Sequence, residues 1–156
     1  MCQSPIQAII RPAMWIPGIK KLHSAKETWV IPQSTVEVCV EQLIEAVNEL
    51  GEKEKMHVNK VNRNKNFVQI FSFTNNEWFD VVEIEFQPGR ESGSIAKARS
   101  FSTGVLPTCC PFAIFLNIIF CFVPFLDNGV NKERLNKIRT NMRVESHVEE
   151  MPDCPV

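Results

Sequence analysis

The clearest pattern along the chain is an amphipathic helix that begins near residue 35. Its apolar stripe recurs at helical spacing and is formed by Val36, Val40, Leu43, Val47 and Leu50. Ser34 and Glu37 have the spacing of a capping box, and Gly51 follows the last apolar position. We therefore expect a helix from Ser34 or Thr35 to Gly51. Its opposite face is acidic and is expected to be solvated or to meet a basic partner; it consists of Glu37, Glu41, Glu45 and Glu49.

Four strand-like runs follow this helix. Apolar and polar residues alternate over residues 56–62, 67–74, 79–86 and 94–104, with polar or glycine-containing turns between them. Short turns between successive strands imply antiparallel pairing. A helix followed by such a meander has to pack on one face of it, so the predicted class is α+β with a four-stranded antiparallel meander.

An apolar insert at residues 105–126 interrupts this ordinary pattern. It contains no charged residue and five phenylalanines. Pro107, Pro111 and Pro124 break it and leave a helix of about a dozen residues, Phe112 to Val123. That length suits a buried or interfacial helix rather than a membrane span.

The insert has to leave and return to one place if the strand before it and the helix after it belong to one domain. A single helix of its twenty-two residues, at about 1.5 Å each, would just cross a bilayer core of about 30 Å. The last helix would then lie on the far side of the membrane from its own sheet. Two helical spans need about forty residues. We therefore expect the insert to rest on a membrane or to fold back onto the domain.

A basic helix is predicted after the insert, with Asn131 as its N-cap. Its apolar positions are Leu135, Ile138 and Met142, and its basic residues are Lys132, Arg134, Lys137, Arg139 and Arg143. Around these elements we expect an irregular N-terminal segment at residues 1–26, a single α+β domain at residues 27–143, and a loose acidic tail at residues 144–156. The N-terminal segment could also be a surface anchor, since it is rich in apolar residues.

Residues 99–104 and 127–135 contain a pair of short motifs. They are Arg99-Ser100-Phe101-Ser102-Thr103-Gly104 and Asp127-Asn128-Gly129-Val130-Asn131-Lys132-Glu133-Arg134-Leu135. Together they resemble the C-terminal signature of the domain-of-unknown-function family 1499. The resemblance covers roughly residues 29–143 and implies a helix before a meander of strands, with no established chemistry. In that family the two motifs are joined almost directly, so the hydrophobic insert is a departure from its pattern.

The insert suggests contact with a membrane surface or lipid. Its candidate contact residues are Phe112, Ile114, Phe115, Ile118, Ile119, Phe122 and Phe125. The basic helix would lie beside anionic lipid, and Cys109 and Cys110 are candidate acylation sites. These adjacent thiols could also form a strained disulfide. Against the membrane hypothesis, the helix is apolar on every face except at Asn117, whereas interfacial helices usually have a polar face.

Three alternatives to the membrane hypothesis remain. The insert could be part of the core, it could form the wall of a pocket for a small apolar ligand, or it could mediate self-association into a homo-oligomer. A small polar pocket where the insert joins the domain could hold an anionic group, although we expect its residues mainly to form a turn and to cap the last helix. These residues are Arg99, Ser100, Ser102, Asp127, Asn128, Asn131 and Arg134.

Composition narrows the function further. The net charge of −1 gives no argument for nucleic acid. His23, His57 and His147 lie far apart in the sequence, and no nucleophile, P-loop or paired-carboxylate motif is present, so we favour a non-enzymatic domain without metal or cofactor. An enzyme that acts on a small apolar molecule, with the insert as its pocket wall, stays open as an alternative. None of the six cysteines forms a C-x-x-C pair, and Cys39 falls on the apolar side of the first helix. We expect a cytoplasmic protein, with membrane association as an open alternative.

Overall fold

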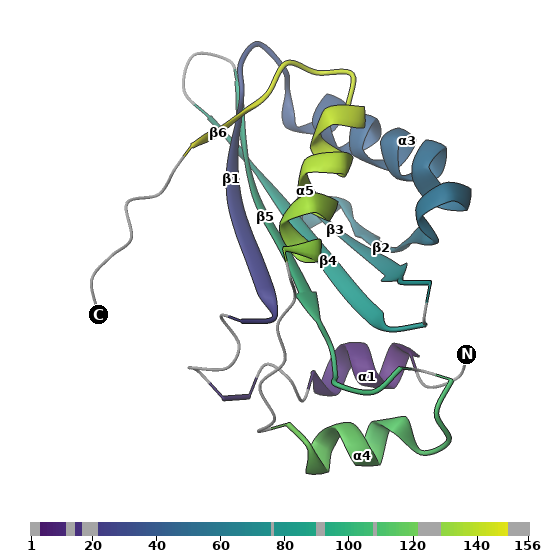
Figure 1. The fold of residues 1–156 in the computed structure, drawn as a ribbon. Helices are drawn as coiled ribbons and strands as arrows, with labels where there is room; N and C mark the ends of the chain where they lie inside the picture. The colour runs from purple at the N-terminus through teal and green to yellow at the C-terminus, as the bar shows by residue number, and fades with distance from the viewer. Residues whose placement is uncertain are drawn as a thin grey trace.

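The computed structural model describes residues 4–11, 15–16, 22–75, 77–89, 93–107, 109–121 and 129–149. Over these residues the protein has helices and one antiparallel sheet, which confirms the α+β class (Figure 1). The sheet has six strands in the order β2-β3-β4-β5-β1-β6. The four-stranded meander expected from the sequence is therefore part of a larger sheet, in which β1 follows β5 and β6 follows β1.

The strands predicted from alternation form the middle and one edge of the sheet. They are β2 (Met56–Asn62), β3 (Phe67–Phe73), β4 (Phe79–Pro88) and β5 (Ser94–Ser102), and each pairs antiparallel with the next. A short 3-10 helix, η2 (Arg63–Lys65), joins β2 to β3. The two further strands come from distant parts of the sequence. β1 (Ser24–Ile31) pairs with β5, and β6 (His147–Glu149) pairs with β1.

Helix α3 (Val36–Glu54) is the amphipathic helix expected from the sequence, and it extends beyond its predicted C-terminal end. Thr35, not Ser34, is the N-cap, and its hydroxyl accepts a hydrogen bond from the Val38 backbone N–H. The helix continues past Gly51 to Glu54 and is capped by Lys55, which adopts the left-handed conformation and donates its N–H to the Gly51 carbonyl. A non-glycine residue thus provides the C-terminal cap, as Asn occasionally does.

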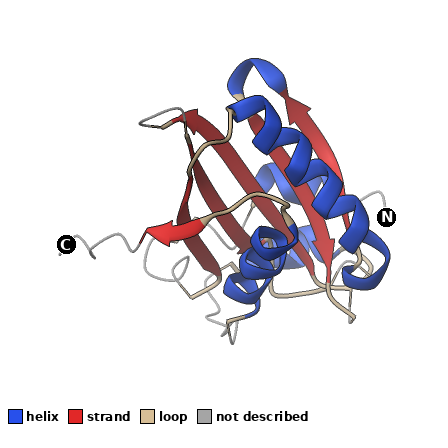
Figure 2. Ribbon diagram, turned by 90° about the horizontal axis from the view of Figure 1, so that it is seen from above, coloured by secondary structure: helices blue, strands red, loops and turns tan. Residues whose placement is uncertain are grey.

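The two faces of the sheet are covered by different helices. Helix α3 packs over β2, β3 and β4, while α5 (Val130–Asn141) packs over β1 and β5 on the same side (Figure 2). The main core lies between these helices and the sheet and includes Trp29, Leu43, Ile84 and Ile138, all fully buried. A smaller cluster on the other face contains Phe71, Phe79, Val81 and Phe101 and packs against Ala8.

Ala8 belongs to α1 (Ser4–Ile10), a helix within the segment that we expected to be irregular. The Gln7 side chain donates to the Thr103 hydroxyl at 3.0 Å, and Thr103 in turn donates to the Phe79 carbonyl at 2.7 Å. Arg11, just after the helix, forms an ion pair with Glu83 and lies over the Phe101 ring at 5.0 Å. These long-range contacts hold α1 on the sheet, and a local sequence pattern does not reveal them.

The apolar insert contains α4 (Ala113–Ile119), which lies with α1 at the lower end of the molecule in Figure 1. Gly104 and Asn131 show where the chain leaves and returns. The Asn117 side chain lies against Gly104, where any added Cβ would be only 2.3 Å from it. After the insert, Asn131 donates to the Ser102 hydroxyl at 3.4 Å. The excursion therefore begins and ends beside the same end of β5.

Candidate functional site

A buried polar network links α5 to the sheet. Arg134 donates to Ser100 Oγ at 3.2 Å, to Asn131 Oδ1 at 2.9 Å and to Asp80 Oδ2 at 2.6 Å. The Arg134 and Asp80 side chains are only 7% and 3% exposed. Asn131 also donates to the His23 carbonyl at 3.0 Å, which connects the network to the start of β1. A guanidinium is thus fixed in position at the sheet surface by several oriented acceptors.

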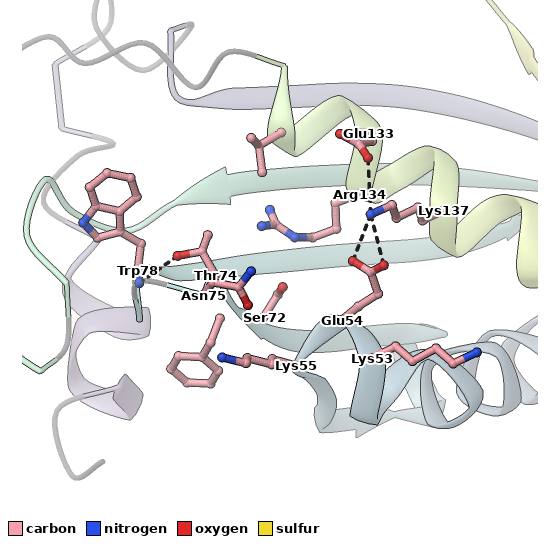
Figure 3. A pocket seen from close by; sticks show the side chains of 12 residues that line it. Lys53, Glu54, Lys55, Ser72, Thr74, Asn75, Trp78, Glu133, Arg134 and Lys137 are labelled. Carbon is pink, nitrogen blue, oxygen red and sulfur yellow. Dashed lines mark hydrogen bonds and ion pairs between the residues drawn. The ribbon is translucent and has the colours of Figure 1, made fainter.

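A cleft of about 550 Å³ opens beside this network (Figure 3). It lies between the C-terminal end of α3, the turn from β3 to β4, and the first turns of α5. Its described lining residues are Lys53, Glu54, Lys55, Ser72, Phe73, Thr74, Asn75, Trp78, Val130, Glu133, Arg134 and Lys137. Arg134 enters from α5 and Lys55 from the opposite wall, at the end of α3.

The charged residues of the cleft fall into two groups. Lys137 contacts Glu54 at 3.0 Å and Glu133 at 3.2 Å, and the hydrogen bond to Glu54 raises the pKa of the Lys137 ammonium. By contrast, no carboxylate among the described side chains lies within 4.0 Å of Lys53 or Lys55. The cleft therefore contains both neutralised and uncommitted positive charges.

The turn between β3 and β4 presents Trp78 at the edge of the cleft. The Trp78 backbone N–H donates to the Thr74 hydroxyl at 3.1 Å, and the Thr74 N–H donates to the Trp78 carbonyl at 3.0 Å. These bonds fix the turn, but the Trp78 side chain remains 46% exposed. Phe73 also borders the cleft, but its ring stacks on Phe79 at 5.2 Å and packs with the cluster on the other face of the sheet.

The structure brings together part of the polar pocket expected from the sequence. Ser100, Ser102, Asn131 and Arg134 share the buried network. Arg99 does not join them, because neighbouring strand residues face opposite sides of the sheet and Arg99 stacks on Phe101 at 4.9 Å. Asn131 is a buried residue inside α5 rather than its N-cap, a position that Gly129 occupies. Asp127 and Asn128 lie outside the described residues.

The sequence analysis missed Asp80, Lys55 and Trp78. Asp80 had a recognisable signal, because the two-residue period of β4 places it on the same face as Val82 and Ile84, which are buried in the core. A charged residue at a position facing the core requires a partner, and Arg134 is that partner. Lys55 and Trp78 had no comparable signal, since both lie in connections between elements.

The basic residues of α5 and the segment after it are largely engaged within the protein. Arg134 pairs with Asp80, Lys137 with Glu54 and Glu133, and Arg143 with Glu45 and Glu49. The Arg139 guanidinium donates to the Asn136 side chain, while Lys132 is exposed. The acidic face of α3 thus meets a basic partner from the same chain, which weakens the expected attraction of this helix to anionic lipid.

The insert presents apolar side chains outward. Ala113 and Asn117 are buried, whereas Phe112, Phe115 and Ile119 are 71%, 64% and 58% exposed. Asn117 holds the helix in place, because its amide donates to the Leu106 carbonyl at 3.2 Å and accepts from the Leu106 N–H at 2.7 Å.

The remaining predicted residues of the insert differ in their exposure. Ile118 is half-buried, Cys109 is exposed and Cys110 is half-buried, and the two cysteines do not form the disulfide considered from the sequence. The Ile114 side chain, Phe122 and Phe125 lie outside what the structure describes. No described helix is long and apolar enough to cross a membrane. Over the described residues no group of His, Cys, Asp and Glu is placed to hold a metal ion.

Comparison with known proteins gives no family for this chain. No family model matches the sequence, and no curated protein matches it. Of the 28 solved chains that match the fold, one is Ara h 8.0201, with a TM-score of 0.49 and 6% identity over 77% of this chain and 95% of that chain. A similarity at this level supports no argument about function. The resemblance to the domain-of-unknown-function family 1499 therefore stays a prediction.

Proposed function

We propose that this chain is a small-molecule-binding domain whose ligand occupies the cleft between α3 and α5. The observation that supports this proposal is that the cleft combines one cationic side chain held in place by the protein with a polar and an aromatic side chain that have no partner of their own in the described part of the chain. Arg134 is held by Asp80, while the Lys55 ammonium and the Trp78 indole have no partner among the described side chains. The volume of about 550 Å³ is within the usual range for ligand sites.

This location differs from the ligand site expected from the sequence. The apolar insert was the expected pocket wall, but no described residue of the insert lines the cleft. The walls come instead from α3, α5 and the β3–β4 turn, and they combine charged residues with aromatic ones. The proposed ligand therefore has both polar and apolar parts rather than being purely apolar.

Filling the cleft should abolish binding. Val130 lines the cleft and is partly exposed at the start of α5, so Val130→Trp would occupy ligand space without changing the core. A small-molecule library is screened by thermal denaturation of the wild-type protein. A ligand present at about 100 times its Kd should raise Tm by about 5–10 °C, because it binds only the folded state.

The matched control is Val61→Trp, which places the same side chain at a similarly exposed position on β2, away from the cleft. We expect the stabilisation by each hit to persist in Val61→Trp and to disappear in Val130→Trp. Hits that stabilise both variants equally would contradict the proposed site.

A second candidate function is contact of the insert with a membrane surface. It is favoured by the outward orientation of Phe112, Phe115 and Ile119, together with the absence of any charged residue from the insert. The buried Asn117 also answers one objection from the sequence, because the single polar residue of the helix faces inward and leaves the outer surface apolar.

Sedimentation with vesicles tests this second function. The double variant Phe112→Ser/Phe115→Ser should lower the vesicle-bound fraction by about tenfold or more, since two phenylalanines would no longer enter the lipid. The comparison uses phosphatidylcholine vesicles with and without phosphatidylserine. If the wild-type protein sediments with neither kind of vesicle, membrane contact of the insert is excluded. A change from dimer to monomer in the variant, without vesicles, would assign the surface to self-association instead.

A further inference from the structure

We infer that the ligand of the α3–α5 cleft is a small monoanion with a flat apolar body, an inference that rests on the proposed function. The juxtaposition behind it is that of Lys55 and Arg134 on opposite walls with Trp78 at the edge (Figure 3). The anionic group would lie between the two cations, and the apolar body would lie against the Trp78 indole.

The charge of the cleft points to an anion. Its lining includes four positive side chains, Lys53, Lys55, Arg134 and Lys137, and two carboxylates, Glu54 and Glu133. Asp80, beneath Arg134, adds a third negative charge. One positive charge is left in excess, which a single anionic group would balance. A cationic ligand would compete with Lys137 for the two carboxylates that this lysine already contacts.

Arg134 is arranged to recognise an oxyanion rather than only to balance charge. A guanidinium has five N–H donors in a rigid plane. Arg134 donates hydrogen bonds to Ser100, Asn131 and Asp80, and the same side chain also lines the cleft. Its orientation is therefore set before a ligand arrives, which lowers the entropic cost of binding.

The exposed Trp78 side chain indicates the shape of the apolar part of the ligand. Trp78 is held by its backbone to Thr74, yet nearly half of its side chain is exposed. Aromatic side chains in binding sites offer a flat apolar surface at a low cost in conformational entropy. A planar hydrocarbon or aromatic ring system stacked on Trp78 would bury this surface, and Val130 would contact its edge.

Three probes of the same size and different charge test the ligand class. They are naphthoate, naphthamide and naphthylmethylamine, which are anionic, neutral and cationic at neutral pH. Binding is measured by isothermal titration calorimetry at low and high salt. We expect naphthoate to bind at least about tenfold more tightly than naphthamide and to weaken with salt, and we expect no binding of the amine.

Two variants test the assigned residues. Lys55→Gln should weaken naphthoate binding about fivefold and leave naphthamide unchanged, because only the ion pair is lost. Trp78→Ala should weaken both probes by about tenfold, since stacking does not depend on the charge. The matched control is Lys97→Gln, an exposed position on β5 outside the cleft, which should change neither affinity.

The outcomes separate this inference from the proposed function. Equal binding of naphthamide and naphthoate, abolished for both by Val130→Trp, would overturn the monoanion inference and leave the cleft as a binding site. Binding of inorganic phosphate as tight as that of naphthoate would overturn the assignment of the apolar body. Binding of all probes that Val130→Trp does not affect would overturn both proposals.

Discussion

Replacing Asp80 with alanine should lower the free energy of unfolding by about 3–5 kcal/mol. The Asp80 carboxylate is nearly inaccessible and pairs with Arg134 at 2.6 Å. Its removal would leave a buried guanidinium without its counter-ion, at a position where water cannot replace the lost interaction. Equilibrium urea denaturation, followed by circular dichroism, measures the change.

Two comparisons make this expectation specific to burial. Glu54→Ala also removes the partner of a cation, but Lys137 and Glu54 are 39% and 33% exposed, so we expect a loss below about 1 kcal/mol. The double variant Asp80→Leu/Arg134→Met should recover much of the stability, because an apolar pair can replace a buried ion pair. A loss below about 1 kcal/mol for Asp80→Ala would contradict the buried pairing.

Replacing a buried and an exposed phenylalanine by alanine should change the free energy of unfolding by very different amounts. Phe101→Ala should lower the free energy of unfolding by about 3–5 kcal/mol, because the ring is fully buried among Phe71, Phe79 and Val81. Phe115→Ala should change it by less than about 0.5 kcal/mol, since this side chain is 64% exposed on α4. The same denaturation experiment measures both.

This pair of substitutions also decides the role of the insert. A loss above about 2 kcal/mol for Phe115→Ala would mean that the insert is part of the hydrophobic core, one of the alternatives left open by the sequence. A small loss agrees with an insert that is attached through Ala113 and Asn117 and presents its phenylalanines to the surroundings.

The elements with a strong local period were predictable from the sequence. The stripe from Val36 to Leu50 gave α3, and the alternation in β3 and β4 gave adjacent antiparallel strands. The ends of α3 were less predictable, because Thr35 competed with Ser34 as the cap and Lys55 supplied a left-handed residue where glycine was expected. Such choices depend on differences of about 1 kcal/mol or less between neighbouring residues.

The features that depend on distant residues were not predictable. Strand β6 depends on pairing of residues 147–149 with the edge of β1. Helix α1 depends on contacts of Gln7 and Ala8 with the far face of the sheet. Asn131 looked like a helix cap in the sequence, but its amide is used inside α5 to bind Ser102 and the His23 carbonyl. Asp80 and Arg134 are 54 positions apart, and only the fold brings them together.

The cleft was also hidden from sequence analysis. The apolar insert is the most distinctive segment of the sequence and was the expected ligand site. The cleft is built instead from the ends of α3, β3 and α5. Lys55 and Trp78 lie in connecting segments, and the other lining residues lie in the β3–β4 turn or in helices and strands, without a recognisable motif. Only their convergence, with Lys55 opposite Arg134, distinguishes them from solvated surface residues.

The most direct measurement of where a ligand binds is an amide NMR titration of the full chain with naphthoate. Binding in the cleft predicts that the shifted resonances concentrate around its described lining, at residues 53–55, 72–75, 78, 130, 133, 134 and 137. The Val130→Trp variant should show no such shifts, while Val61→Trp should show them unchanged. Shifts confined to α1 and α4, or spread weakly over the whole surface, would contradict a ligand site between α3 and α5.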